Sequence, residues 1–103
     1  MSVTYGIKVS GEGLSAKALM ETKKLTGKPL SDIKSAVAAG VPIFECDCAD
    51  EEGMEIMLAL RSALEAEGAK PTHLVNGRVE PFSHLENALN SYRSIDEVDG
   101  EEY

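Results

Sequence analysis

Apolar and polar residues alternate over residues 3–9 and 43–48. Alternation with a period of two is typical of half-buried β-strands, so both segments are predicted to be strands. The residues expected to face the core are Val3, Tyr5, Ile7, Val9, Phe44, Cys46 and Cys48. A third strand is expected over residues 71–75. The pair Asn76-Gly77 that follows is typical of a tight turn, so the chain is expected to pair back briefly at residues 78–79.

Other segments carry apolar residues at helical spacing, which predicts helices between and after the strands. The expected helices cover residues 14–26, 30–39 and 50–67, and a fourth begins after Ser83. Gly27 and Gly40 stand where the first two helices would end. Asp50 is a good N-cap for the third, and Ser83 with Glu86 fits a capping box for the fourth.

The element order is β-α-α-β-α-β followed by a C-terminal helix, which predicts an α+β fold with a small three-stranded sheet and helices on one face. We expect residues 1–93 to form a single domain, since a chain of 103 residues has room for one modest core. Residues 94–103 are polar and acidic and are expected to form a disordered tail. The residues expected to be buried are Ile7, Leu25, Ile33, Val37, Phe44, Met57, Leu60 and Leu64.

The third predicted helix has a wide apolar side. At 100° per residue its apolar side chains spread over roughly 200°, which is wider than one core-facing stripe needs. Arg61 lies within this arc, beside Met54 and Leu58. Two explanations stay open: the C-terminal helix covers the excess apolar surface, which we favour, or the surface contacts a partner.

The net charge of −8 is unevenly distributed along the chain. Residues 1–40 hold six lysines and three acidic residues, a charge of +3, whereas residues 41–103 hold four basic and fifteen acidic residues, a charge of −11. A negative chain is repelled by nucleic acid, so direct binding to it is not expected, but a local basic face can bind an acidic surface. The apolar runs are too short to span a bilayer and no export signal is evident, so we expect a cytoplasmic protein that is not bound to a membrane.

Cys46 and Cys48 are two positions apart on a predicted strand. Their Cα atoms would then be roughly 7 Å apart, beyond the usual span of a disulfide, so reduced thiols packed in the core are expected. Their spacing differs from that of zinc sites, and neither His73 nor His84 lies in a recognisable catalytic motif. We therefore expect no metal, no cofactor and no enzymatic activity.

Residues 26–34, at the turn between the first two helices, have the sequence TGKPLSDIK, and residues 64–69 have the sequence LEAEGA. These segments resemble Thr-Gly-Leu-Gly-Leu-Lys-Glu-Ala-Lys and Leu-Glu-Glu-Ala-Gly-Ala in the C-terminal domain of the bacterial ribosomal stalk protein. The element order also agrees over residues 14–75. The resemblance implies the fold of that domain, which is shared with the adaptor of the Clp protease, although no stretch matches that adaptor's binding-pocket motif.

The stalk domain recruits translation factors through its first two helices, with a short basic and apolar patch. By this resemblance Lys23 corresponds to a family arginine and Lys34 to the last lysine of the turn motif. Met20 and Ser31 stand where the family has lysines, and Pro29 replaces a glycine. The resemblance implies a protein-interaction module, and we expect a monomer or weak homodimer. The expected partner-binding residues are Lys17, Met20, Lys23, Lys24, Lys28, Leu30 and Lys34.

An alternative interpretation starts from the acidic half of the chain. Residues 45–55 and the acidic C-terminal residues would suit an inhibitor or nucleic-acid mimic that occupies a basic site on a nucleic-acid-binding protein. Salt-sensitive capture of an acidic partner favours the first function, and capture of a basic partner favours the second.

Overall fold

Strand β1 (Thr4–Val9) lies inside a four-stranded antiparallel sheet. Its neighbours are β2 (Phe44–Asp47) on one side and β3 (Pro71–Val75) on the other, and β4 (Arg78–Glu80) pairs with β3 at the edge. The structure is a computed structural model that describes residues 3–9 and 14–101, with side chains as far as Ser91. Gly11 and Gly13, which follow β1 in the sequence, lie outside the described residues.

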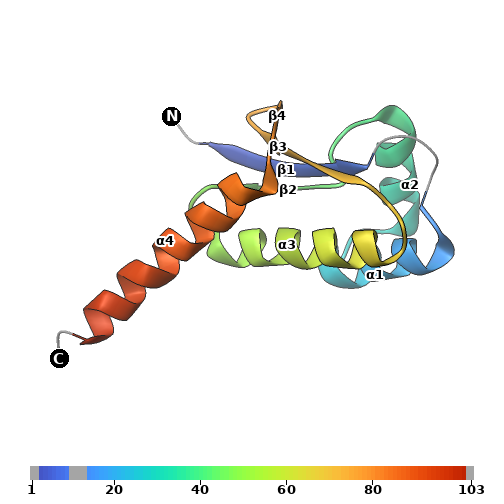
Figure 1. Ribbon diagram of the computed structural model, residues 1–103. Coiled ribbons are helices and arrows are strands. Elements are labelled where there is room, and N and C mark those ends of the chain that lie inside the picture. Colours follow the sequence, from blue (N-terminus) through green and yellow to red (C-terminus); the bar gives the residue numbers. More distant parts are fainter. Residues whose placement is uncertain (1–2, 10–13, 102–103) are drawn as a thin grey trace.

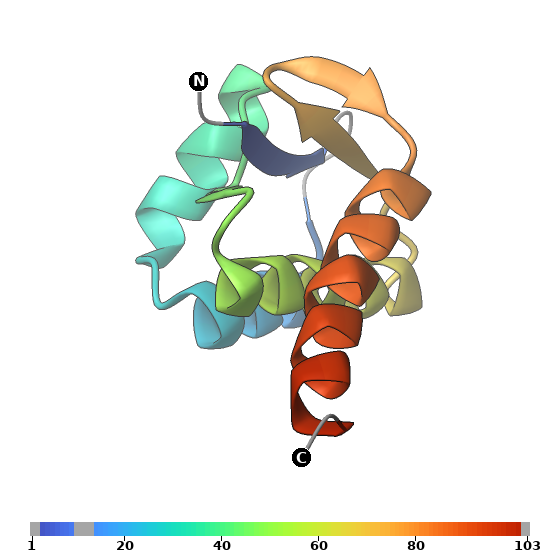
Figure 2. The same ribbon diagram turned by 90° about the vertical axis from the view of Figure 1, so that its left-hand side faces the viewer.

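Helices α1 (Ala16–Thr26) and α3 (Glu51–Ala66) lie side by side across one face of the sheet (Figures 1 and 2). Helix α2 (Leu30–Ala39) stands at one end of the molecule, and α4 (Phe82–Glu101) leads away from the opposite end. The predicted α+β class is therefore confirmed. In the part of the chain that the structure describes, none of the helices is long and apolar enough to cross a membrane.

The expected count of three strands is corrected to four. Asn76 and Gly77 both adopt positive φ angles, of 51° and 83°, which is the backbone geometry of a two-residue hairpin turn. This turn returns the chain beside β3, so that Val79 pairs with Leu74. The brief pairing expected after the turn is thus a complete edge strand.

The register of β2 places alternate side chains on opposite faces of the sheet. Cys46 pairs with Tyr5 of β1 and is buried, whereas Glu45 and Asp47 are exposed. Cys48 lies just beyond the strand, where it is partly buried and its N–H donates to the carbonyl of Val3. The prediction that Cys46 faces the core, with Glu45 and Asp47 on the other face of the sheet, is confirmed.

Five of the eight residues expected in the core are buried. They are Ile7, Ile33, Met57, Leu60 and Leu64. Leu25, Val37 and Phe44 are only partly buried, although all three pack against the core. Phe44 keeps some exposure because β2 is an edge strand, and Leu25 and Val37 lie near the ends of their helices.

The C-terminal helix differs from the expectation at its start, and its described range extends beyond residue 93. Helix α4 begins at Phe82, directly after Pro81. Proline keeps the residue before it, Glu80, in an extended conformation, so the helix starts only after Pro81. Ser83 therefore lies inside the first turn and is not the N-cap. The helix also continues past residue 93 to Glu101, and no glycine or proline interrupts residues 82–99.

Helix α4 covers the wide apolar side of α3. Its Leu85 and Leu89 are buried in the core cluster, and Met54 of α3 is fully buried in the same cluster. Leu58 is partly buried and packs against it. The explanation that we favoured, cover by the C-terminal helix, is confirmed.

Leu60→Ala tests the central position of α3. Leu60 is fully buried among the sheet, α1 and α4, so truncation should lower the free energy of unfolding by about 2–5 kcal/mol. The exposed Ser62 on the same helix provides the control, since Ser62→Ala should change it by no more than about 0.5 kcal/mol. Urea denaturation measures both values, and a loss below about 1 kcal/mol for Leu60→Ala would contradict its place in the core.

Candidate protein-binding surface

One side of α1 packs on the protein with small side chains. Ala18 and Thr22 are buried, and the Thr22 hydroxyl donates to the Ala18 carbonyl at 2.8 Å, so it needs no partner elsewhere. Ser15 caps the start of the helix by accepting from the Ala18 N–H at 3.2 Å. The small buried residues let α1 lie close to α3.

Met20 lies on the opposite side of α1, about 160° around the helix from Thr22 at 100° per residue. Its exposed fraction is 55%, which is high for a large apolar side chain. It lines a surface hollow of about 290 Å³ together with Glu21, Lys23 and Lys24. Because Met20 contributes little to the core, its apolar side chain is free to contact another molecule.

The turn into α2 places the remaining candidate residues. Gly27 ends α1 with a φ of 73°, a left-handed conformation that glycine adopts without steric cost. Pro29 then occupies the N-cap position of α2, with Leu30 partly buried behind it. Ile33 anchors α2 in the core, and Lys34, about 100° further around the helix, is exposed.

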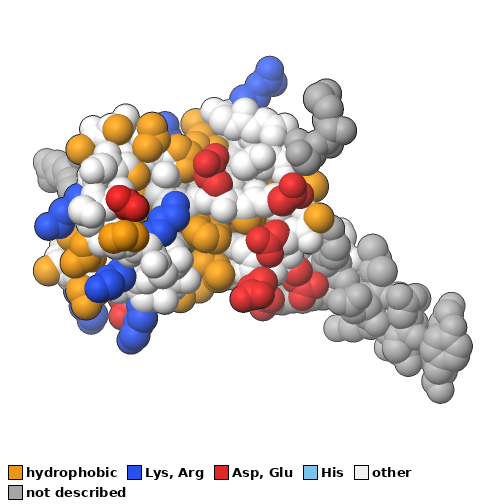
Figure 3. All heavy atoms as spheres, turned by 180° about the vertical axis from the view of Figure 1, so that it is seen from behind, with side chains coloured by type: hydrophobic (Ala, Val, Ile, Leu, Met, Phe, Trp, Pro, Cys, Tyr) orange, Lys and Arg blue, Asp and Glu red, His pale blue; other side chains and the backbone are white. Residues whose placement is uncertain are grey.

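The lysines of this region differ in their partners. Lys17 forms an ion pair with Glu67 at 3.6 Å, across the gap between α1 and the end of α3. Lys23, Lys24, Lys28 and Lys34 are exposed and, within residues 3–9 and 14–91, form no ion pair. On the face shown in Figure 3, most of the basic side chains lie at the α1–α2 end of the molecule, whereas acidic side chains predominate toward α4.

The structure thus brings three of the seven predicted residues, Met20, Lys23 and Lys24, into one hollow. Lys28, Leu30 and Lys34 follow on the adjoining turn and helix, outside the described lining of that hollow. Lys17 lies on the same helix but pairs with α3. The sequence analysis missed Glu21, which adds a negative charge beside Met20, although its position next to Met20 in the sequence was a clue.

Cys46 and His73 are both buried. Burial and the nearby carboxylates Asp50 and Asp47 raise the pKa of Cys46 to about 11, so this thiol keeps its proton at neutral pH and is a weak nucleophile. His73 is buried beneath the sheet, away from the α1–α2 surface. Among the described residues, no group of three or more His, Cys, Asp or Glu side chains is placed to hold a metal ion.

Comparison with known proteins identifies no relative. No family model matches the chain, and no curated protein or solved structure has significant similarity to it. The surface must therefore be interpreted from its own geometry.

Alkylation tests the environment of Cys46. A rise in pKa from 9.0 to about 11 lowers the thiolate fraction at pH 8 by about a hundredfold. In a Cys48→Ala variant, which leaves Cys46 as the only thiol, iodoacetamide should therefore react about a hundredfold more slowly with folded protein than with urea-unfolded protein. Mass spectrometry of quenched samples measures both rates, and equal rates would show that Cys46 is accessible and normally acidic.

Proposed function

We propose that the chain is a protein-interaction module that binds an acidic partner protein through the exposed side of α1 and the start of α2. The observation that carries this proposal is the hollow at Met20, an exposed apolar side chain with lysines on its rim. Protein interfaces commonly combine an apolar centre with a polar rim, and a methionine adapts its shape to the partner.

The unpaired lysines give the surface its charge preference. Lys23 and Lys24 flank the hollow, and Lys28 and Lys34 extend the positive region along the turn and α2. Their combined field attracts an acidic surface even though the whole chain carries −8. Such attraction mainly accelerates association and selects the partner, while Met20 supplies apolar contact.

The same two helices form the factor-binding surface in the ribosomal stalk domain that residues 14–75 resemble. The resemblance supports the proposed use of this surface and does not identify the partner. The free thiols of Cys46 and Cys48 are compatible with the cytoplasmic location that we propose.

A second candidate function rests on the acidic surface around β2 and the start of α3. Glu45, Asp47, Asp50, Glu52 and Glu55 are all exposed there. This surface would suit an inhibitor that occupies a basic nucleic-acid-binding site. A basic partner, captured without the lysines, would favour this function.

The lysine surface consists of Met20 and the exposed lysines Lys23, Lys24, Lys28 and Lys34. Reversing the charge of two of these lysines distinguishes the two functions. The double variant K23E/K34E should lose capture of an acidic partner from a lysate of the source organism, because both positions then repel it. The matched control K70E/R78E changes the net charge equally at two exposed positions that belong to neither α1 nor α2, and should retain capture.

Capture is measured by quantitative mass spectrometry at low and high salt, and the affinity is then measured with the purified partner. Binding to the surface should weaken steeply with salt, since exposed charges are screened over about 8–10 Å at ordinary ionic strength. If K23E/K34E binds as tightly as the unchanged protein while K70E/R78E does not, the α1–α2 surface is not the binding site.

A further inference from the structure

His73 of β3 lies in an apolar and aromatic environment where the sheet meets the start of α4. Its exposed fraction is 1%. The imidazole stacks on the ring of Phe82, with 5.3 Å between centroids and 27° between planes, and lies 5.6 Å from the ring of Tyr5. Phe82 is the first residue of α4, so the histidine ring forms part of the surface on which that helix docks.

The hydrogen bonding of His73 sets the tautomer of its neutral ring. Its Nδ1 lies 3.1 Å from the Gly6 carbonyl oxygen, which can only accept, so Nδ1 carries the hydrogen. Nε2 is buried and has no hydrogen-bond partner among the described residues. Protonation at Nε2 would therefore create a buried N–H and a positive charge without an acceptor, which is costly.

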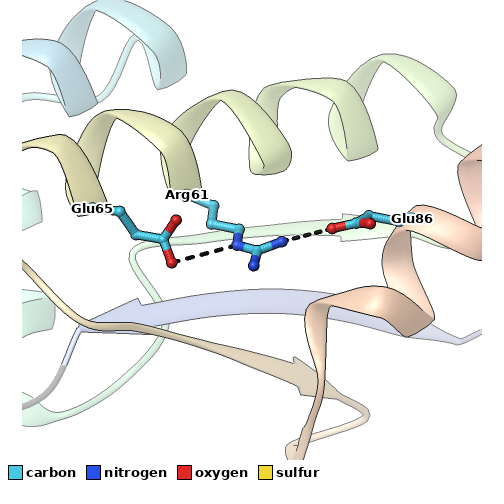
Figure 4. Close-up of polar contacts among 3 residues, drawn as sticks. All are labelled: Arg61, Glu65 and Glu86. Atoms are coloured by element: carbon cyan, nitrogen blue, oxygen red, sulfur yellow. Dashed lines mark hydrogen bonds and ion pairs between the residues drawn. The ribbon is translucent and has the colours of Figure 1, made fainter.

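Arg61 of α3 also packs on the ring of Phe82. Its guanidinium carbon lies 4.6 Å from the centre of the Phe82 ring. Its Nη1 donates to Glu86 of α4 at 2.6 Å, while its Nε lies 3.5 Å from Glu65, an ion pair too long and misaligned to count as a hydrogen bond (Figure 4). The Phe82 ring thus contacts both the Arg61 guanidinium and the imidazole of His73.

The charged and titratable groups around His73 act in opposing directions. Burial is the largest effect and lowers the pKa of His73, and His84 of α4 lowers it further. The hydrogen bond to Gly6 and the carboxylate of Glu80, its partner on β4, raise it. The net result is a pKa below the ordinary value. Arg61 also places a positive charge against the Phe82 ring.

We propose that His73 is an acid-sensitive latch for α4, whose protonation releases residues 82–91 from α3 and the sheet while β1, β3 and α1 stay folded. This device is independent of the lysine surface on α1 and α2. Helix α4 packs mainly against α3 and follows the short edge strand β4, so its release breaks little of the sheet. It would expose Leu85 and Leu89 together with the apolar side of α3 that they cover.

The direction of the pH effect follows from linkage. In the released state the imidazole is hydrated and takes up a proton near its ordinary pKa of about 6.5, whereas the docked state resists protonation. Docking is therefore strongest above that pH and weakens as the pH falls below it, by up to about tenfold for each pH unit until the docked ring itself is protonated.

Hydrogen–deuterium exchange between pH 7.5 and 5.5, corrected for the intrinsic pH dependence of exchange, measures the release. Amide protection over residues 82–91 should fall by up to about tenfold between pH 7.5 and 5.5, while protection in β1 and α1 stays unchanged. The lower limit stays above the range in which side-chain carboxyl groups usually take up protons. Equal loss of protection in β1 and α1 would show global unfolding and overturn the latch.

Two variants assign the effect to one ring. His73→Gln cannot be protonated and should remove the pH dependence, whereas His84→Gln changes an exposed histidine of the same cluster and should keep it. If His73→Gln fails to fold, NMR titration of the unchanged protein decides, because the His73 resonance and the α4 amides should titrate together at a midpoint below 6.5. A pH response that survives in His73→Gln, or a His73 titration unlinked to the α4 amides, would overturn the proposal.

Discussion

Helix α3 can lie close to β2 only because residue 53 has no side chain. A Cβ atom at Gly53 would stand 2.5 Å from the Cβ of Cys46, a separation that real Cβ atoms essentially never show. The same glycine donates its N–H to the side chain of Asp50 at 2.8 Å, which caps α3. One backbone position thus sets both the start of α3 and its distance from the sheet. The burial of Met54, Met57, Leu60 and Leu64 along the helix depends on that distance.

With α3 fixed on the sheet, its two sides carry different elements. Helix α1 packs on one side through Ala18 and Thr22, whose small size leaves Met20 and the neighbouring lysines outside the core. Helix α4 packs on the other side through Leu85 and Leu89. The proposed binding surface and the proposed acid-sensitive contact are therefore separated by the helix that holds the core together.

The sequence predicted the elements well wherever short-range chemistry decides. The glycines that end α1 and α2, the Asp50 cap and the Asn76-Gly77 turn act within a few residues, so their effects can be recognised without the fold. The lysines were expected at the surface because long cationic side chains are seldom buried unpaired. That Lys17 would pair with Glu67 was not predictable, because the pair joins residues fifty positions apart.

The aromatic and histidine cluster escaped the sequence analysis for the same reason. The hydrogen bond between His73 and Gly6 joins residues 67 positions apart, and the bond between Arg61 and Glu86 joins residues 25 apart. Arg61 was noted in the sequence as a charged residue within an apolar arc of α3. The structure explains its position there, because its guanidinium packs on Phe82 and forms an ion pair with Glu86 of α4. A charged residue on an apolar helix side can therefore indicate where another element docks.

The segregation of charge has a consequence for the orientation of any acidic partner. The region of residues 1–40 carries +3 and the rest of the chain −11, so the molecule attracts such a partner at one end and repels it over most of its remaining surface. Repulsion from the acidic part disfavours wrong encounters, and attraction at Lys23, Lys24, Lys28 and Lys34 favours the encounter in which Met20 meets the partner. In the proposed function, the excess negative charge of the chain would therefore restrict binding to the lysine surface and would not oppose it.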